Sequence, residues 1–306
     1  MTAAEIAVAL DGKKASKYEW RARCPVHRGE HRNLSIKDVE GGVSVWCYSH
    51  LCDRADIWAA IHDIIGGTDV STSARPSQPE PDDELLKRIG RARRLWNEGR
   101  SIRGTTAERY LGSRGLELPD DLSMLRFHPR CPRGSDERHP ALVCALTSVE
   151  EIDWVGDIAV PRFKAVHRIF LLPDGSDRLR KDADGEDRGK MSFGPAHHTV
   201  VRLSADEDVT MGLGICEGVE DAVAALNDGW APMWSTAGTG GLQSFPVLGG
   251  IEALTVFADD DTPGISAATV AVDRWRKTGR QAEIVPPPWG SKDLNQFIQQ
   301  RRGRHG

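Results

Sequence analysis

Apolar and polar positions alternate in two different rhythms along the C-terminal two thirds of the chain. From residue 210 onward, strand-like apolar runs alternate with amphipathic helical segments; the strands are expected at 212–216, 231–236, 251–259 and 282–287 and the helices at 218–229 and 265–279. Strands that alternate with helices are typical of a parallel sheet covered by helices. The pattern predicts a parallel α/β sheet in this region.

The preceding region has a different pattern. Residues 84–99 carry apolar side chains at helical spacing, and residues 107–116 show a second helical pattern. Residues 139–205 alternate apolar and polar positions between polar turns. Such alternation is typical of antiparallel strands joined by hairpins. We therefore expect helices followed by an antiparallel sheet before the parallel one begins.

A polar stretch separates these regions from a small N-terminal module. Residues 66–84 are rich in Pro, Ser, Thr, Gly and Asp and show no apolar periodicity. This composition is typical of a flexible linker. The expected organisation is an N-terminal module at 1–66, a linker at 67–83, a basic subdomain at 84–208 and a second domain at 209–306.

Composition places the chain among globular proteins. Its 306 residues are 39% hydrophobic and 28% charged, which are ordinary values for a soluble domain. No apolar run approaches the roughly 20 residues that span a bilayer, and the N-terminal stretch lacks the features of a signal peptide. We expect a cytoplasmic protein without a membrane partner.

The formal net charge of −5 conceals an uneven distribution. Residues 84–138 carry 13 Lys and Arg against 8 Asp and Glu, whereas residues 209–306 carry 8 against 11. A basic segment therefore precedes an acidic one. The overall negative charge does not exclude a polyanionic partner such as nucleic acid.

Two short-spaced pairs of potential metal ligands lie in the N-terminal module. Cys24 and His27 have a C-x2-H spacing, Cys47 and Cys52 a C-x4-C spacing, and a hairpin pattern lies between the pairs. Two such pairs form a tetrahedral Zn²⁺ site, which stabilises a module too small for a large core. His50 is an alternative to Cys52 as the fourth ligand. We predict structural Zn²⁺ in a hairpin-based ribbon.

Acidic residues follow two of the expected parallel strands. One strand ends at Glu217, and another ends at Asp259, Asp260 and Asp261. Asp259 and Asp261 point the same way in an extended segment, and Asp293 adds an acid after the last strand. Ligands of α/β sheets bind at these strand ends, where carboxylates suit Mg²⁺ or Mn²⁺. Asp261 also fits the N-cap of the following helix.

These acidic motifs resemble the Toprim domain. The segments "LGICEGVEDAVAAL", "FADDDTPGISAA" and "KDLN" are most similar to the Toprim domains of phage, plasmid and mobile-element primases. The Cys-His-Cys-Cys pattern resembles the zinc ribbon that precedes the catalytic domain in those primases. The resemblance implies a zinc ribbon linked to a two-lobed catalytic region that ends in a Toprim α/β domain.

The resemblance also implies an activity, which is the synthesis of short RNA primers from NTPs on a single-stranded DNA template. Asp259 and Asp261 would bind Mg²⁺ or Mn²⁺, Asp293 would contribute a further ligand, and Glu217 would be a ligand or assist proton removal. The expected nucleotide or template contacts are Arg162, Lys164, Arg168 and Lys190. No P-loop pattern is present, so any replicative helicase would be a separate partner.

Three other functions account for some of these features. A topoisomerase needs a tyrosine nucleophile, and none of Tyr18, Tyr48 and Tyr110 lies in a suggestive setting. A metal-dependent Toprim nuclease would use the same carboxylates with water as nucleophile. A non-catalytic single-stranded DNA-binding adaptor would not need carboxylates that face phosphate. Primase is therefore the preferred interpretation, with the nuclease and the adaptor as alternatives.

Overall fold

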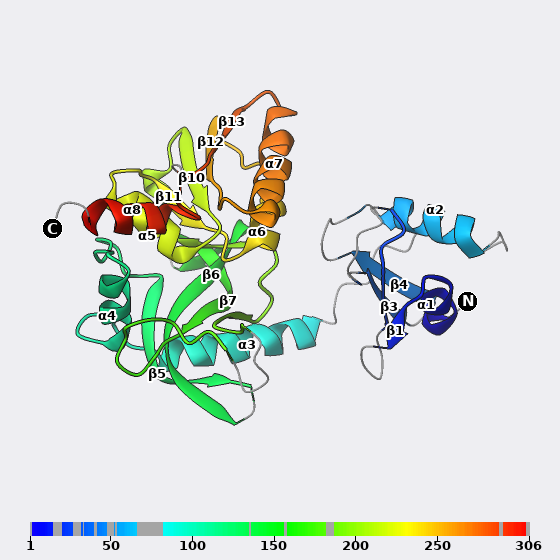
Figure 1. Ribbon diagram of the computed structural model, residues 1–306, viewed down its shortest axis with the longest axis horizontal. Helices are drawn as coiled ribbons and strands as arrows, with labels where there is room; N and C mark the ends of the chain where they lie inside the picture. Colours follow the sequence, from blue (N-terminus) through cyan, green and yellow to red (C-terminus); the bar gives the residue numbers. More distant parts are fainter. Residues whose placement is uncertain are drawn as a thin grey trace. The chain divides into compact units, whose positions relative to one another are not determined.

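The computed structural model forms two compact units, residues 1–78 and residues 79–306 (Figure 1). The structure describes residues 2–14, 20–26, 32, 34–39, 42–47, 52, 54–65, 82–134, 136–155, 158–181, 187–287 and 290–303. Within these ranges, no helix has the length and apolar character needed to cross a membrane. The predicted linker at 67–83 falls outside the described residues up to position 81.

The first unit is a four-stranded antiparallel sheet with two helices packed against it. Its elements are α1 (Ala3–Ala9), β1 (Lys13–Lys14), β2 (Trp20–Ala22), β3 (Leu34–Val39), β4 (Gly42–Cys47) and α2 (Arg54–Ile65), with strand order β1-β2-β3-β4. A capping box of Thr2 and Glu5 begins α1. Val39 pairs with Gly42 in the register of β3 and β4, which confirms the predicted hairpin.

The second unit contains one nine-stranded sheet and six α-helices over its described residues. The first elements are α3 (Asp82–Glu98), α4 (Thr106–Ser113), β5 (Leu125–Arg133), β6 (Glu137–Val155), β7 (Ile158–Phe170), β8 (Lys190–Phe193), β9 (Thr199–Arg202) and a 3-10 turn (Asp206–Asp208). The later elements are β10 (Gly212–Cys216), α5 (Val219–Asn227), β11 (Met233–Ser235), α6 (Thr239–Gln243), β12 (Ala253–Phe257), α7 (Thr262–Arg276), β13 (Gln281–Val285) and α8 (Leu294–Gly303).

The sheet joins an antiparallel half to a parallel half. Its order is β13-β12-β10-β11-β9-β6-β7-β8, with β5 paired to β6. Strands β10 to β13 are mutually parallel, whereas β9 pairs antiparallel with both β11 and β6. Both predicted types of sheet are therefore confirmed. The finding that they are continuous through β9 was not expected from the sequence.

Helices cover both faces of this sheet (Figure 1). Buried side chains of α4, α5 and α8 form one core with alternate residues of the strands. The opposite face packs against α3 in the antiparallel half and against α6 and α7 in the parallel half. The parallel half thus has the two-sided apolar cover that parallel sheets require.

Most elements match the sequence-based expectation within a few residues. The helices α3, α4, α5 and α7 and the parallel strands are confirmed. In the second unit, β5, α6 and α8 were not anticipated, and in the first unit the same holds for α1, β1, β2 and α2. Of these, α6 has five residues and begins at Thr239, so it is too short for a clear helical pattern.

Candidate active site

Three cysteines of the first unit lie together. Cys24, Cys47 and Cys52 have ligand atoms that all lie within 4.8 Å of one another, and the sulfurs of Cys24 and Cys52 are 3.8 Å apart. Zinc–sulfur bonds of about 2.3 Å at tetrahedral angles place two sulfurs about 3.8 Å apart. Burial and the neighbouring thiols raise the pKa of Cys52 to about 12. The group therefore fits a cation such as Zn²⁺.

Cys52, which the sequence favoured over His50, belongs to this group. Both candidate histidines, His27 and His50, fall outside the described residues. The fourth ligand therefore stays a prediction. The hairpin explains how the group forms, because β4 ends at Cys47 beside the buried start of β3 at Leu34.

Two acidic strand ends of the second unit lie side by side. Strands β10 and β12 are parallel neighbours, with Cys216 paired to Phe257 in the register. Glu217 follows β10 directly, and Asp259 lies two residues beyond the end of β12. Both side chains line one cavity of about 570 Å³. The sheet therefore brings together the two acids that the sequence placed at neighbouring strand ends.

Asp261 and Asp293 both cap helices. The Asp261 side chain accepts a hydrogen bond from the Gly264 amide at 2.9 Å and begins α7. Asp293 accepts one from the Gln296 amide at 2.7 Å at the start of α8. Asp293 lines the cavity, whereas Asp261 is not part of its wall. The predicted N-cap role of Asp261 is confirmed.

Asp221 is an acid of this site that sequence reasoning missed. It lies in the first turn of α5, is 8% exposed, and accepts a hydrogen bond from the Asn295 amide at 3.0 Å. It lines the same cavity as Glu217 and Asp259. Acids are favoured in first turns because of the helix dipole, so the sequence offered no signal of burial.

The carboxylates of the cavity repel one another. Burial, together with Glu217, Asp293 and Asp261, raises the pKa of Asp259 to about 7. Burial, Asp293 and Asp259 raise that of Asp221 to about 7. Burial also raises the pKa of Glu217. A site that resists the ionisation of its own acids is short of positive charge, which a divalent cation would supply.

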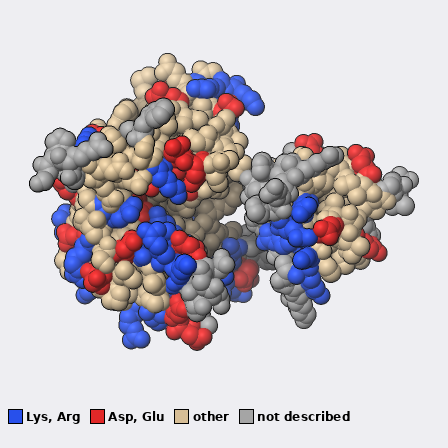
Figure 2. Space-filling model, in the orientation of Figure 1, with Lys and Arg blue, Asp and Glu red and all other residues tan. Residues whose placement is uncertain are grey.

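Cations also line the cavity, and all of them except Lys292, which lies 3.5 Å from the Asp261 carboxylate, come from outside the acidic strand ends and the start of α8. The basic residues of the cavity are Arg114, Arg178, Arg180, Lys190 and Lys292. On the face of the second unit that Figure 2 draws, Lys and Arg side chains lie next to Asp and Glu side chains. A cavity lined by both carboxylates and cations suits a ligand that carries both phosphates and metal.

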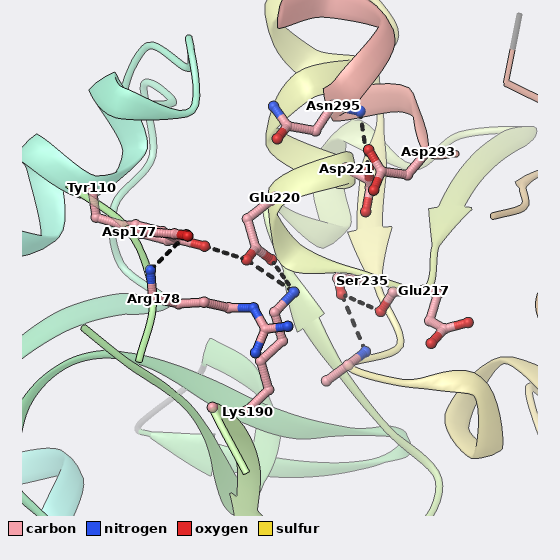
Figure 3. A network of polar contacts seen from close by, with 12 residues as sticks. Tyr110, Asp177, Arg178, Lys190, Glu217, Glu220, Asp221, Ser235, Asp293 and Asn295 are labelled. Carbon is pink, nitrogen blue, oxygen red and sulfur yellow. Dashed lines mark hydrogen bonds and ion pairs between the residues drawn. The ribbon is translucent and has the colours of Figure 1, made fainter. Parts of the chain in front are cut away.

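A buried network links acidic and basic residues of the cavity (Figure 3). The Glu220 carboxylate, in a residue that is 3% exposed, accepts hydrogen bonds from Lys190 at 3.0 Å and from the Tyr110 hydroxyl at 2.7 Å. Burial opposes ionisation of Glu220, but Lys190 and Tyr110 outweigh it and lower its pKa to about 2. The network connects α4, β8 and α5 beside Asp221. No sequence signal identified Glu220, which also lies in a first helical turn.

The structure places the four predicted nucleotide contacts differently. Lys190 lines the cavity. Arg168 is 5% exposed, donates to the Pro132 carbonyl at 2.7 Å and lies over the rings of Phe170 and Phe193. The remaining two, Arg162 and Lys164, lie on β7 outside the cavity wall. The structure therefore brings one of the four to the acidic site.

The cavity also fits Mg²⁺ or Mn²⁺. These ions prefer oxygen ligands, and Mg²⁺ commonly keeps several waters while it binds one or two carboxylates. Among the described residues, the carboxylates of the cavity do not form a group of three ligand atoms within 4.8 Å. They supply several oxygens around one open space, which is an arrangement for a partly hydrated ion.

Comparison with known sequences identifies two regions. Residues 86–203 match a domain of unknown function (DUF7146), and residues 212–304 match the Toprim domain. The Toprim match includes all of the acidic residues described above. A comparison with curated proteins yielded no match.

Several solved structures are similar over much of the chain. The zinc-binding and RNA polymerase domains of the Aquifex aeolicus primase give a TM-score of 0.46 at 11% identity, covering 99% of this chain and 84% of that one. A DNA primase domain from Pseudomonas aeruginosa gives 0.46 at 13% identity, covering 72% and 77%. The primase fragment of the bacteriophage T7 primase-helicase protein gives 0.42 at 14% identity, covering 90% and 93%.

The predicted Toprim domain is confirmed by the sequence match and by the acidic ends of its parallel strands. The fold is mixed α/β, with a three-cysteine group in the N-terminal unit. The C-terminal part of this chain, residues 212–304, is a Toprim domain.

Proposed function

We propose that the protein is a DNA primase that joins ribonucleotides into short RNA primers on single-stranded DNA. The observation that carries this proposal is the cavity of the Toprim domain, where acidic strand ends and cations line the same space. Nucleotidyl transfer needs both, because phosphates must be held while charge on the reacting oxygens is neutralised.

The acidic residues would hold the catalytic ions. Glu217, Asp259 and Asp293 line the cavity together with Asp221. Asp261 stays a candidate ligand because its second oxygen faces Lys292 at 3.5 Å, a cation that an ion can replace. Bound Mg²⁺ or Mn²⁺ would activate the attacking 3′-oxygen and neutralise charge on the departing pyrophosphate.

The cationic residues would orient the NTP. Arg178 and Arg180 lie in the loop between β7 and β8, and Arg114 lies at the C-cap of α4. Arginine binds phosphate through paired N–H groups. Lys190 is held at the wall by Glu220. Arg162 and Lys164 stay candidate contacts for the template, outside the cavity.

The remaining parts of the chain have supporting roles in this proposal. Residues 1–66 would form a DNA-binding zinc ribbon with Zn²⁺ held by Cys24, Cys47, Cys52 and His27, joined by the linker at 67–83. Residues 84–208 would form the basic subdomain and residues 209–306 the catalytic one. The continuous sheet supports a rigid connection between the last two.

Primer synthesis on single-stranded DNA tests the proposal. Full-length protein, labelled NTPs and Mg²⁺ or Mn²⁺ should yield short RNA products that Asp259→Asn abolishes. Asp260→Asn is the matched control, since this neighbouring acid is exposed and does not line the cavity. Degraded DNA without NTP incorporation would indicate the nuclease instead. DNA binding with neither product nor cleavage, with any metal, would indicate the adaptor.

A further inference from the structure

A second, smaller cavity adjoins the candidate active site. Its volume is about 150 Å³, and Asp221 and Asp259 line both cavities. The rest of its wall is mostly apolar and includes Trp230, Phe257 and Phe297. The two cavities therefore share two acidic residues, but the smaller one has a mostly apolar wall.

The helix C-cap that precedes the cavity fixes the main chain at Trp230. Gly229, at φ +90°, follows the end of α5. The Gly229 amide donates to the Leu226 carbonyl at 3.0 Å and the Trp230 amide to the Ala225 carbonyl at 2.9 Å, which is the bonding of a Schellman motif. The ring meets Phe257 edge to face at 5.1 Å. The capped main chain and the contact with Phe257 therefore place the Trp230 ring at the cavity.

Trp230 remains 47% exposed despite its size. In a Schellman motif the apolar residue at this position commonly packs back against its own helix. A half-exposed, fixed aromatic ring is suited to stacking, because a flat partner covers its free surface at little conformational cost. The position therefore favours a flat ring system as the occupant.

The charges of the cavity exclude a phosphate as its occupant. Within the described part of the chain, no Lys or Arg lines it, whereas Asp221, Asp228 and Asp259 do. Asp228 is paired with Arg301. The other two carboxylates are hydrogen-bond acceptors, which suit ring N–H or amino donors. The space holds one ring system and is too small for a whole nucleotide.

We infer that this cavity is a subsite for the heterocyclic base of a nucleotide whose phosphates lie in the adjoining active-site cavity. The base stacks on Trp230, and the acidic part of the wall favours the N–H edge of a base over a phosphate. The inference rests on the proposed function for the position of the phosphates. The base belongs either to the incoming NTP or to the single-stranded template, and binding experiments distinguish these sources.

The test compares ligands with and without a base. Full-length wild-type protein, Trp230→Ala and Trp230→Phe are titrated calorimetrically, in Mg²⁺, with NTP, inorganic tripolyphosphate and a single-stranded DNA oligonucleotide. Stacking one base contributes about 1–3 kcal/mol, so Trp230→Ala should weaken base binding roughly 5- to 150-fold. Tripolyphosphate should bind unchanged, and Trp230→Phe should restore most of the affinity. Met211→Ala, at a residue that is 65% exposed and outside the cavity, is the control.

Weaker binding of NTP but not of DNA assigns the subsite to the incoming base, and the reverse result assigns it to the template. Equal loss for NTP and tripolyphosphate, or no loss for either NTP or DNA, overturns the inference. The proposed function is tested separately. If the wild-type protein synthesises primers and the Trp230→Ala variant binds every ligand normally, the subsite is wrong and the proposed primase function stands. If Trp230→Ala weakens base binding but the wild-type protein makes no primers, the subsite stands and the proposed primase function is wrong.

Discussion

Replacing Lys190 with methionine removes the cation that pairs with the buried Glu220 carboxylate but keeps a side chain of similar length. In the native protein Lys190 donates to the Glu220 carboxylate at 2.9 and 3.0 Å, and the Tyr110 hydroxyl donates to it at 2.7 Å. In the variant Glu220 would remain in the core with the Tyr110 contact but without the cation. The side chain of Glu220 is 4% exposed and that of Lys190 is 36% exposed. Solvent therefore reaches the lysine but hardly the carboxylate.

Breaking a buried pair by removing one partner costs about 3–5 kcal/mol, because the other charge is left uncompensated. The partial exposure of Lys190 favours the lower end, about 3 kcal/mol. Residues 79–306 form one unit. In a unit of this size, each kcal/mol of lost stability lowers the melting temperature by about 2–4 °C. The melting temperature of this unit should therefore fall by roughly 6–12 °C at neutral pH.

The loss of stability caused by Lys190→Met should depend on pH. In the native protein the pKa of Glu220 is lowered to about 2, so the stability from the ion pair is present above the unfolded value of about 4.3 and is lost as pH falls toward 2. Without Lys190, burial is opposed only by neutral hydrogen bonds, from the Tyr110 hydroxyl and from the backbone, so the pKa of Glu220 rises. The variant can then protonate Glu220 in mild acid, and its deficit relative to wild type should shrink as pH falls.

Differential scanning calorimetry of a double-mutant cycle measures this energy. Glu220→Gln combined with Lys190→Met should recover much of the loss, with a coupling energy of at least about 2 kcal/mol. Lys87→Met on α3, at an exposed position, controls for the loss of a lysine. A Lys190→Met deficit no larger than that of Lys87→Met, or one that does not change with pH, would refute the reasoning.

Three further outcomes follow from the same contacts. Asp259→Asn removes one of several repelling carboxylates, so it should raise the melting temperature in EDTA. It should also reduce the stabilisation by Mg²⁺. Thermal shift measures both effects, and an unchanged Mg²⁺ response would contradict the reasoning. Cys47→Ser, or a strong chelator, should unfold residues 1–65 without lowering the melting temperature of the second unit, and hydrogen exchange would separate the two. Asp261→Ala should destabilise by about 1 kcal/mol through loss of the α7 cap, against less than about 0.5 kcal/mol for exposed Asp260→Ala, as chemical denaturation would show.

The local features of the site were predictable. The acids after β10 and β12 follow apolar strands, and the parallel alternation of strands and helices places such ends at one edge of a sheet. The cysteine spacing likewise depends on a hairpin that the sequence shows directly. These predictions succeed because each depends on neighbours within a few residues, where periodicity and turn residues carry the information.

Long-range pairings were not predictable. Glu220 and Asp221 have the appearance of solvated first-turn acids, yet both are buried by helices from distant parts of the chain. Tyr110 reaches Glu220 from 110 positions away. Among the cations, Arg168 and Lys190 were both predicted to contact nucleotide or template, but Arg168 lies in the core. Burial, which decides between these outcomes, is a property of the packed molecule.

The sequence by itself therefore determined most helices and strands of the second unit, the Toprim motif, and the cysteines and acids that are proposed to bind metal. Only the tertiary structure decided that β9 joins the two halves of the sheet and that Glu220 holds Lys190 at the candidate active site. It also decided that Trp230 lines the smaller cavity next to that site. The physical reason is the range of the interactions. Periodicity and capping act within a few residues, whereas the pairing and desolvation of charges depend on segments that meet only when the chain is folded.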